Sequence, residues 1–402
     1  MPDVSHHPLL SDHRTHEDAS FVDFGGVPLV QTFGEPHAEY AAIRKSCGLF
    51  DAANRACFSL AGKDRHEFLG NLITNKTWDR TTRTGLSAGR GTRAFLLNLK
   101  GRVVADLTLI ERGEELLIDV DRRLVPMLID VLGRYVFSEK VTFADRSTTH
   151  ARLSLFGPGS AKVLQDAGGV DAASLVSYGS LEATLFGTQT TVWREDLTAS
   201  PGLHLLIDRD KVGTVWQGLI DAFADVGQES NKRRLRPIGW AAFNTTRIEA
   251  GEPILGIDYE PAAPSVPGKR KDDAPEEPGA KGILPAETGL FERAVDVTKG
   301  CYLGQEIVAR MFARKVVARR LVGFKMSADA LPSAGTMIVD PTGADVGIVT
   351  SSTLSPVLSS TCIGLALVKR PHFEAGAALT IHAEGSAQPA TVVELPFVST
   401  AT

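Results

Sequence analysis

The sequence predicts an α+β protein with mostly antiparallel sheets and a small all-β domain near its C-terminal end. Three observations support this fold class: neighbouring strand-like runs are too frequent for a repeating strand–helix–strand protein, amphipathic helical segments interrupt them, and the pattern after Arg310 is all-β. With 402 residues, 43% of them hydrophobic, the chain is long enough for two or three domains.

The first 20 residues are polar and contain His6, His7, His13 and His16. They lack the apolar core of a signal peptide, so we expect a disordered leader over residues 1–20. A metal-binding tail is the alternative that the four histidines leave open.

Helices and strands follow one another irregularly in the next two hundred residues. Apolar residues at helical spacing predict helices over residues 37–46, 63–74, 122–135, 159–168 and 210–227. Short β-rich or alternating runs predict strands over residues 56–62, 92–99, 102–111, 114–121, 140–146, 151–157, 190–196 and 202–208. Gly48 is expected to end the first helix, Pro126 to lie in the first turn of its helix, and Lys100-Gly101 to form a hairpin turn.

Composition changes sharply over residues 261–282, which contain five prolines and many charges but only one sizeable apolar residue, Val266. Such a segment cannot offset its own ordering entropy, so we expect a disordered insertion there. Short strands separated by turns then predict a C-terminal β-barrel over residues 318–397.

Charge and motifs narrow the classes of function. The formal net charge of −5 gives no overall attraction to nucleic acid or to an anionic membrane. The four cysteines form no CxxC pair, so we expect no intrinsic metal and a reducing, cytoplasmic location. Phosphate-binding, serine-hydrolase and dinucleotide motifs are absent from the sequence, and no apolar run is long enough to span a membrane.

The stretch TKGCYLGQEIV at residues 298–308 contains the most conspicuous candidate residue, Cys301. A thiol reacts as the thiolate, and two features favour that form here: Lys299 lies two residues earlier, and a helix is expected to begin near Gly304. The alternative is an inert, buried cysteine on a turn.

Three further groups of polar residues are candidates, each with a structural alternative. Asp106 interrupts an apolar strand and is expected to act on protons beside a cleft, unless its side of the strand faces water. Arg247, in TRIEAGEPILGID, has the geometry to bind a carboxylate, or it forms a surface ion pair. The basic residues from Arg310 to Arg320 predict RNA binding or form a solvated face.

The octapeptide KGCYLGQE at residues 299–306 resembles the K-G-C-Y-x-G-Q-E signature of the YgfZ family of folate-binding proteins. That family assists iron–sulfur cluster assembly or repair, and it is similar in turn to the T-protein of the glycine cleavage system, a tetrahydrofolate-dependent aminomethyltransferase. The resemblance extends over residues 20–397. Weaker supporting segments occur in the family's order at residues 43–51, 97–107, 246–258, 284–295 and 319–326.

The resemblance implies a three-domain ring around a central folate channel. The first α+β domain then comprises residues 21–60 and 145–245, the second residues 61–144 and 246–317, and the barrel residues 318–397. It also implies tetrahydrofolate or a folate derivative as cofactor, with Cys301 and Asp106 as catalytic residues. The residues then expected to bind the folate are Arg247, Lys299, Tyr302, Gln305, Glu306 and Glu195.

The sequence also departs from the T-protein pattern. One of the paired aspartates of that protein is replaced by Ala105, whereas Asp106 falls on the second, the one taken as catalytic. Carboxylates that help to read the pterin are replaced by Ser200, Pro201 and His204, so that Glu195 or Asp196 would have to substitute. A tyrosine before Gly256 is replaced by Leu255.

These departures, together with the cysteine signature, favour a folate-binding accessory protein that serves iron–sulfur assembly machinery or client iron–sulfur proteins through Cys301. The first alternative is a tetrahydrofolate-dependent aminomethyltransferase of the T-protein type that uses Asp106. The second is a tRNA-associated or scaffold protein that uses the basic residues Arg310–Arg320.

Overall fold

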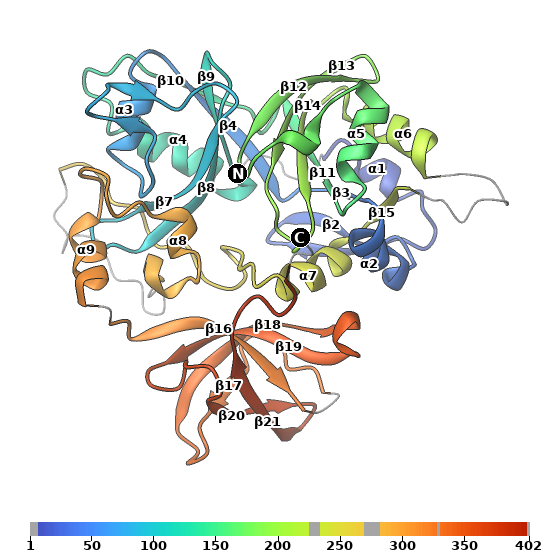
Figure 1. Ribbon diagram of the computed structural model, residues 1–402, viewed down its shortest axis with the longest axis vertical. Helices are drawn as coiled ribbons and strands as arrows, with labels where there is room; N and C mark the ends of the chain where they lie inside the picture. The colour runs from blue at the N-terminus through green and yellow to red at the C-terminus, as the bar shows by residue number, and fades with distance from the viewer. Residues whose placement is uncertain (1–6, 225–233, 269–281, 315, 328–329, 400–402) are drawn as a thin grey trace. The chain divides into compact units, whose positions relative to one another are not determined.

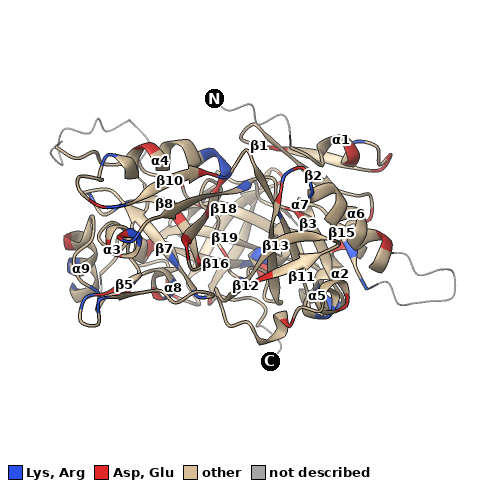
Figure 2. Cartoon of the chain, turned by 90° about the horizontal axis from the view of Figure 1, so that it is seen from above, with Lys and Arg blue, Asp and Glu red and all other residues tan. Residues whose placement is uncertain are grey.

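A computed structural model describes residues 7–224, 234–268, 282–314, 316–327 and 330–399 (Figure 1). The fold is α+β with mainly antiparallel sheets and a closed six-stranded barrel at its C-terminal end, which confirms the predicted fold class. The chain divides into two compact units. The first unit comprises residues 1–68, 77–93 and 107–246. The second unit comprises residues 69–76, 94–106 and 247–402. The division into three domains stays a prediction. Figure 2 shows acidic and basic residues interspersed along the chain, as expected for a small net charge.

The first unit contains a six-stranded sheet with the order β12-β13-β14-β11-β3-β15. Its pairs are antiparallel except that β15 runs parallel to β3. The strands are β3 (Gly48–Asp51), β11 (His150–Phe156), β12 (Ser180–Leu185), β13 (Thr188–Arg194), β14 (Gly202–Asp208) and β15 (Arg236–Ile238). Helices α5 (Ser160–Gly168) and α6 (Val212–Phe223) belong to the same unit, and residues 225–227 of the predicted helix lie outside the described part.

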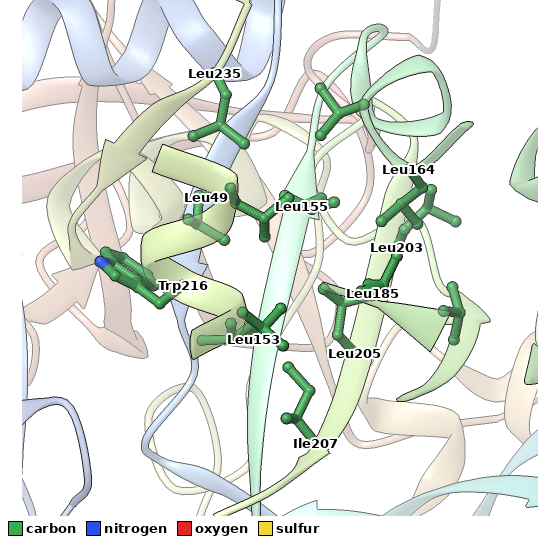
Figure 3. Packing of buried hydrophobic residues seen from close by; sticks show 14 of the residues in the cluster. Leu49, Leu153, Leu155, Leu164, Leu185, Leu203, Leu205, Ile207, Trp216 and Leu235 are labelled. Atoms are coloured by element: carbon green, nitrogen blue, oxygen red, sulfur yellow. The ribbon is translucent and has the colours of Figure 1, made fainter. Parts of the chain in front are cut away.

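The main core of this unit lies between the six-stranded sheet and its helices (Figure 3). Alternate residues of a strand face the same side, so Leu203, Leu205 and Ile207 of β14 all contribute to one apolar surface. Leu164 of α5 and Trp216 of α6 pack into the same cluster. The opposite side of the same strands is therefore free to carry polar side chains.

A five-stranded sheet with the order β10-β4-β9-β8-β7 contains both strands of the predicted hairpin. Its strands are β4 (Arg55–Ala61), β7 (Gly91–Leu97), β8 (Val103–Glu111), β9 (Glu115–Asp121) and β10 (Thr142–Asp145). Helix α4 (Val125–Gly133) has Pro126 in its first turn, as expected, whereas α3 (Arg65–Gly70) is shorter than the predicted helix. That helix ends early because Ile73 forms a β-bridge with Leu96.

The N-terminal segment differs from the expectation of a disordered leader, although residues 1–6 lie outside the described part. Residues Leu10–His13 form the short helix α1, and Leu9 is completely buried in the main core. His13 contacts Asp51 with 3.0 Å between Nε2 and Oδ2, and His7 contacts the same oxygen atom at 3.2 Å. The polar composition misled the prediction because these histidines pair with a buried carboxylate instead of facing water.

Other short elements complete the first unit. They are β1 (Ser20–Phe24), β2 (Val27–Thr32), α2 (Pro36–Lys45), β5 (Trp78–Asp79) and β6 (Thr84–Gly85), with 3-10 helices at Arg122–Leu124 and Ala172–Ser174. Gly48 was expected to end the helix now seen as α2. It instead begins β3, because Ser46 already forms the C-cap.

The second unit contains the barrel, with the strand order β16-β19-β18-β17-β20-β21. Its strands are β16 (Arg319–Met326), β17 (Met337–Val339), β18 (Asp345–Ser355), β19 (Thr361–Lys369), β20 (Ala378–Ala383) and β21 (Ser386–Val393). Ahead of it come α7 (Trp240–Glu249, whose last residues enter this unit), α8 (Phe291–Ala294) and α9 (Gln305–Arg314), and 3-10 helices occur at Pro285–Glu287 and Pro356–Leu358. Most of the predicted disordered insertion, residues 269–281, lies outside the described part.

Candidate functional site

Asp106 lies on β8, and it is buried rather than facing water. Every residue of β8 is buried, so both sides of this strand are covered and the alternation of apolar residues carries no information about exposure. The hydroxyl group of Tyr259 donates a hydrogen bond of 3.4 Å to Asp106 Oδ2. Only 9% of Asp106 and 6% of Tyr259 is exposed, so the carboxylate and its phenol partner lie together in a nearly dry environment.

A tight turn over residues 254–259 places Tyr259 against Asp106. Gly256 has a φ of +84°, which glycine adopts without strain, and its amide donates to the carbonyl oxygen of Tyr259 at 2.8 Å. Leu255 and Tyr259 form an isolated parallel β-bridge. The side chain of Asp258 stabilises the turn because its Oδ2 accepts a bond from the amide of Ile254 at 2.8 Å. Sequence reasoning missed Tyr259, for which no motif gave a signal.

Arg247 is fully buried, and its guanidinium group is engaged with protein atoms. Nη1 donates to Asp258 Oδ2 at 2.5 Å and to the carbonyl oxygen of Glu252 at 3.2 Å, and Nη2 donates to Ser351 Oγ at 2.6 Å. Because Ser351 lies on β18, Arg247 links the turn at residues 254–259 to the barrel within the second unit. These bonds give Arg247 a structural role, and its predicted role in folate binding stays a prediction.

Lys299 of the KGCYLGQE segment lies in a ring of backbone oxygen atoms. Its ammonium group donates to the carbonyl oxygens of Gly70, Ile73 and Asn75 at 2.6, 2.5 and 3.0 Å. It also lies 5.1 Å from the centre of the Tyr302 ring, a cation–π distance. Lys299 therefore fastens this segment to residues 70–75, and its predicted contact with a folate stays a prediction.

The glycine and tyrosine of the segment have packing roles. Gly304 has a φ of +79°, and a Cβ atom there would lie 2.5 Å from the carbonyl oxygen of Asn98, so a larger residue does not fit. Tyr302 is buried, and burial together with nearby Asp296 raises its pKa to about 12. Cys301, directly before Tyr302, is exposed to solvent, which excludes the alternative of a buried thiol.

Gln305 and Glu306 occupy the first turn of α9, where the sequence predicted a helix to begin. The amide of Gln305 donates to the carbonyl oxygen of Tyr302 at 3.3 Å. Glu306 is largely exposed, and it pairs with Arg310 one turn later at 3.0 Å. Their predicted contact with a folate stays a prediction.

We expect Cys301 to react with a soluble thiol reagent much faster than the other three cysteines of the native protein. Cys47, Cys57 and Cys362 are buried, and burial raises the pKa of each, to about 11 for Cys362. Their modification should be at least about tenfold slower, because it requires local opening. Mass spectrometry of the labelled peptides measures this, and a second thiol reacting as fast as Cys301 would contradict it.

Within the first unit, a buried polar cluster joins strands of the six-stranded sheet to strands of the five-stranded sheet, and we call it the inter-sheet cluster. Its members are Arg55, Cys57, Thr108, Asp119, Arg152, Ser154, Glu195 and His204. Arg152 of β11 donates to Asp119 of β9 at 2.5 Å, which joins the sheets. The carbonyl oxygen of Glu195 can only accept, so His204 carries its proton on Nε2, and Nδ1 accepts from Arg152 at 2.7 Å. Burial and Arg152 lower the pKa of His204 well below its usual value.

Glu195, which the sequence offered as a pterin reader, belongs to this cluster. Its Oε1 accepts a bond from Thr108 at 3.1 Å, and burial raises its pKa although Arg93 and Arg152 counteract part of that rise. Asp196, the other candidate, forms an ion pair with Arg194 at 2.8 Å. His204, which stands where a carboxylate was expected, is instead a neutral side chain with its polar atoms engaged.

Three of the basic residues between Arg310 and Arg320 have partners within the second unit. Arg310 pairs with Glu306, Arg319 donates to Glu287 at 3.4 Å, and the guanidinium group of Arg320 lies 4.6 Å from the centre of the Phe373 ring. Lys315 lies outside the described residues. RNA binding by this run stays a prediction, and much of its charge is already neutralised or covered.

Among the described residues, no group of three or more His, Cys, Asp or Glu side chains is arranged to hold a metal ion. In the same part of the chain no helix is both long and apolar enough to cross a membrane.

Comparison with known proteins places the chain in a family with an N-terminal domain and a C-terminal barrel. The family pattern described as the GCVT N-terminal domain matches residues 10–265, and the glycine cleavage T-protein C-terminal barrel domain matches residues 319–399. The chain belongs to this T-protein family. That membership confirms the wider resemblance predicted from the sequence, whereas the assignment to the YgfZ branch is a finer proposal.

Individual relatives match along almost the whole chain. The aminomethyltransferase of Saccharopolyspora erythraea is 28% identical over 390 residues, which cover 96% of each chain. That of Moorella thermoacetica is 28% identical and covers 99% of this chain and 98% of its own length. The solved aminomethyltransferase T of the glycine cleavage system from Bartonella henselae superimposes with a TM-score of 0.81 over 98% of both chains at 20% identity, which shows a shared fold.

Proposed function

We propose that this chain is a tetrahydrofolate-dependent transferase of the aminomethyltransferase type. The observation that carries the proposal is the match of both family domains together with relatives named aminomethyltransferase over nearly the full length. These matches favour the first alternative drawn from the sequence over the iron–sulfur accessory role. Asp106, the aspartate that the T-protein pattern retains here, is the residue to which we assign the chemistry.

Asp106 and its partner Tyr259, both in the second unit, have side-chain chemistry that suits a folate. Tetrahydrofolate, when bound, supplies the nitrogen atoms that accept a one-carbon unit. Asp106 is a buried carboxylate with a phenol partner, and such a group can accept a hydrogen bond or a proton from an N–H group and stabilise positive charge that develops beside it. The guanidinium group of Arg247 already donates hydrogen bonds to Asp258, Ser351 and a carbonyl oxygen. It therefore does not present a pair of N–H groups to the glutamate moiety of a folate.

The proposal is tested by supplying the wild-type protein with an aminomethylated lipoyl carrier protein and tetrahydrofolate. We expect ammonia and methylene-tetrahydrofolate in equal amounts, and calorimetry should show tetrahydrofolate binding. Binding without any turnover would reject the transferase activity on this donor. Neither binding nor turnover would reject the proposed function as a whole.

A second candidate is the iron–sulfur accessory role, which the exposure of Cys301 within a fastened loop favours. In a strain that lacks its own factor of this kind, the wild-type gene should restore the activity of iron–sulfur enzymes and Cys301→Ser should not. The control variant is Cys57→Ser, which removes a buried thiol and should complement if the protein folds. Full complementation by Cys301→Ser would eliminate the thiol role.

A further inference from the structure

Asp106 is a carboxylate that the fold has removed almost completely from water. Burial disfavours the ionised form of a carboxyl group, because the charge loses its hydration. A buried carboxylate that must accept a proton or face a positive charge therefore needs a hydrogen-bond donor to its charged form. Tyr259, whose hydroxyl group points to Asp106 Oδ2, is such a donor.

The position of Tyr259 is fixed by more than packing of its ring. Its backbone takes part in the β-bridge with Leu255 and accepts the bond from the amide of Gly256. The preceding residue, Asp258, accepts bonds from Arg247, Thr350 and Ser351. The chain thus uses a buried ionic network to hold the single turn that presents the phenol to the carboxylate.

Tyr259 lies three residues after Gly256, close to a position at which this chain departs from the T-protein pattern. The T-protein pattern has a tyrosine before Gly256, and this chain has Leu255 there. Leu255 and Tyr259 are bridge partners, so Tyr259 lies beside the position at which the pattern has its tyrosine.

We propose that Tyr259 is a positioning residue for Asp106: its hydroxyl group donates to Oδ2, orients the carboxylate and favours its ionised form. The inference rests on the proposed role of Asp106 in transfer. The 3.4 Å separation is longer than a strong O–H···O bond, and such bonds commonly tighten when a substrate binds. Tyr259 itself touches the carboxylate and is not assigned a contact with the reacting atoms.

The direct test follows the titration of Asp106 by carbon-13 NMR in protein labelled at aspartate side-chain carboxyl groups. The signal of Asp106 is assigned by its absence from Asp106→Asn. In Tyr259→Phe, which keeps the ring, we expect Asp106 to titrate at higher pH than in the wild type. Replacing Tyr259 by a fluorotyrosine, a stronger donor, should move the titration to lower pH.

The matched control is Tyr40→Phe, which removes the hydroxyl group of a similarly buried tyrosine that lies against Arg44. It should leave the titration of Asp106 unchanged. In the transfer assay, Tyr259→Phe should lower kcat about three- to tenfold at neutral pH and shift the acid limb of the kcat/KM profile upward. A purely structural tyrosine would alter thermal stability without moving that limb.

The outcomes separate this inference from the proposed function. If wild-type protein performs no transfer, the proposed function fails, while the NMR titration still decides whether Tyr259 acts on Asp106. If Asp106 titrates at the same pH in the wild type, Tyr259→Phe and the fluorotyrosine protein, the inference is wrong.

Discussion

Asp106→Asn should reduce aminomethyl transfer by about 10²- to 10⁴-fold, the range typical of a lost general acid or base. Asparagine has nearly the same size as aspartate, so the surrounding strands need not move. It cannot accept a proton at neutral pH, and it carries no negative charge to stabilise a cation. The reaction should therefore slow although the fold is preserved, and the rate is measured as methylene-tetrahydrofolate formed per enzyme.

Stability provides the complementary measurement for Asp106→Asn. A buried carboxylate is costly in a folded protein, so the amide should leave the free energy of unfolding unchanged or raise it. Asp340→Asn is the control, since Asp340 caps a surface turn through Thr342 and Ala344 and should keep full transfer activity. Transfer within about threefold of the wild type would remove Asp106 from the catalytic role.

Sequence periodicity predicts best those elements that have one apolar and one polar side. Helices α5 and α6 fall where the pattern placed them, because their buried apolar residues face the core of Figure 3. Strand β14 also falls where it was predicted, and its alternate residues Leu203, Leu205 and Ile207 face the same core. Helix α7 was missed for the opposite reason. Its sequence contains asparagine, threonine and arginine, yet most of it is buried, so no amphipathic stripe marks it.

The sequence identified candidate residues of the site better than it identified their partners. The sequence drew attention to Asp106, Arg247, Lys299 and Cys301, but at least one partner of each of the first three comes from a distant segment of the chain. The carbonyl oxygens around Lys299 come from more than 200 residues earlier in the chain, and the serine that binds Arg247 lies 104 residues later. Backbone oxygens and single serines leave no pattern in a sequence, so the local argument assigned both cations to a ligand or thiol instead.

The solvent exposure of single side chains was predicted from the sequence correctly in some places and wrongly in others. An exposed Cys301 agrees with a working thiol, and Gly304 after it is required by a close backbone contact. The four N-terminal histidines were taken for a disordered tail, although two of them bury against Asp51. The imidazole ring of histidine has apolar carbon atoms and two polar nitrogen atoms, so it can be buried as well as solvated. Composition alone therefore does not distinguish a solvated tail from a segment whose histidines bind a buried carboxylate.

Arg247→Ala should destabilise the second unit by about 3–5 kcal/mol, the cost of leaving a buried charge without its partner. The guanidinium group and Asp258 are both completely buried as side chains. Removing the cation leaves Asp258 with the amide of Ile254 and two hydroxyl groups as donors, and it also removes the bond to Ser351 of β18. Chemical denaturation followed by circular dichroism gives the free energy of unfolding.

Two further variants test the ionic origin of this loss. The double variant Arg247→Ala/Asp258→Ala should be less unstable than the sum of the two single variants, because it leaves no isolated charge. Arg310→Ala is the matched control on the surface. Its pair with Glu306 is exposed on both sides and should contribute less than about 0.5 kcal/mol.

The same variants decide between the two roles considered for Arg247. A structural arginine lowers tetrahydrofolate binding only in proportion to the fraction of protein that unfolds, so the folded fraction of Arg247→Ala should bind with the wild-type dissociation constant. If Arg247 contacts the folate, binding weakens in fully folded protein while stability changes by less than about 1 kcal/mol. That second pattern would overturn the assignment of Arg247 as the connection between the turn at residues 254–259 and the barrel.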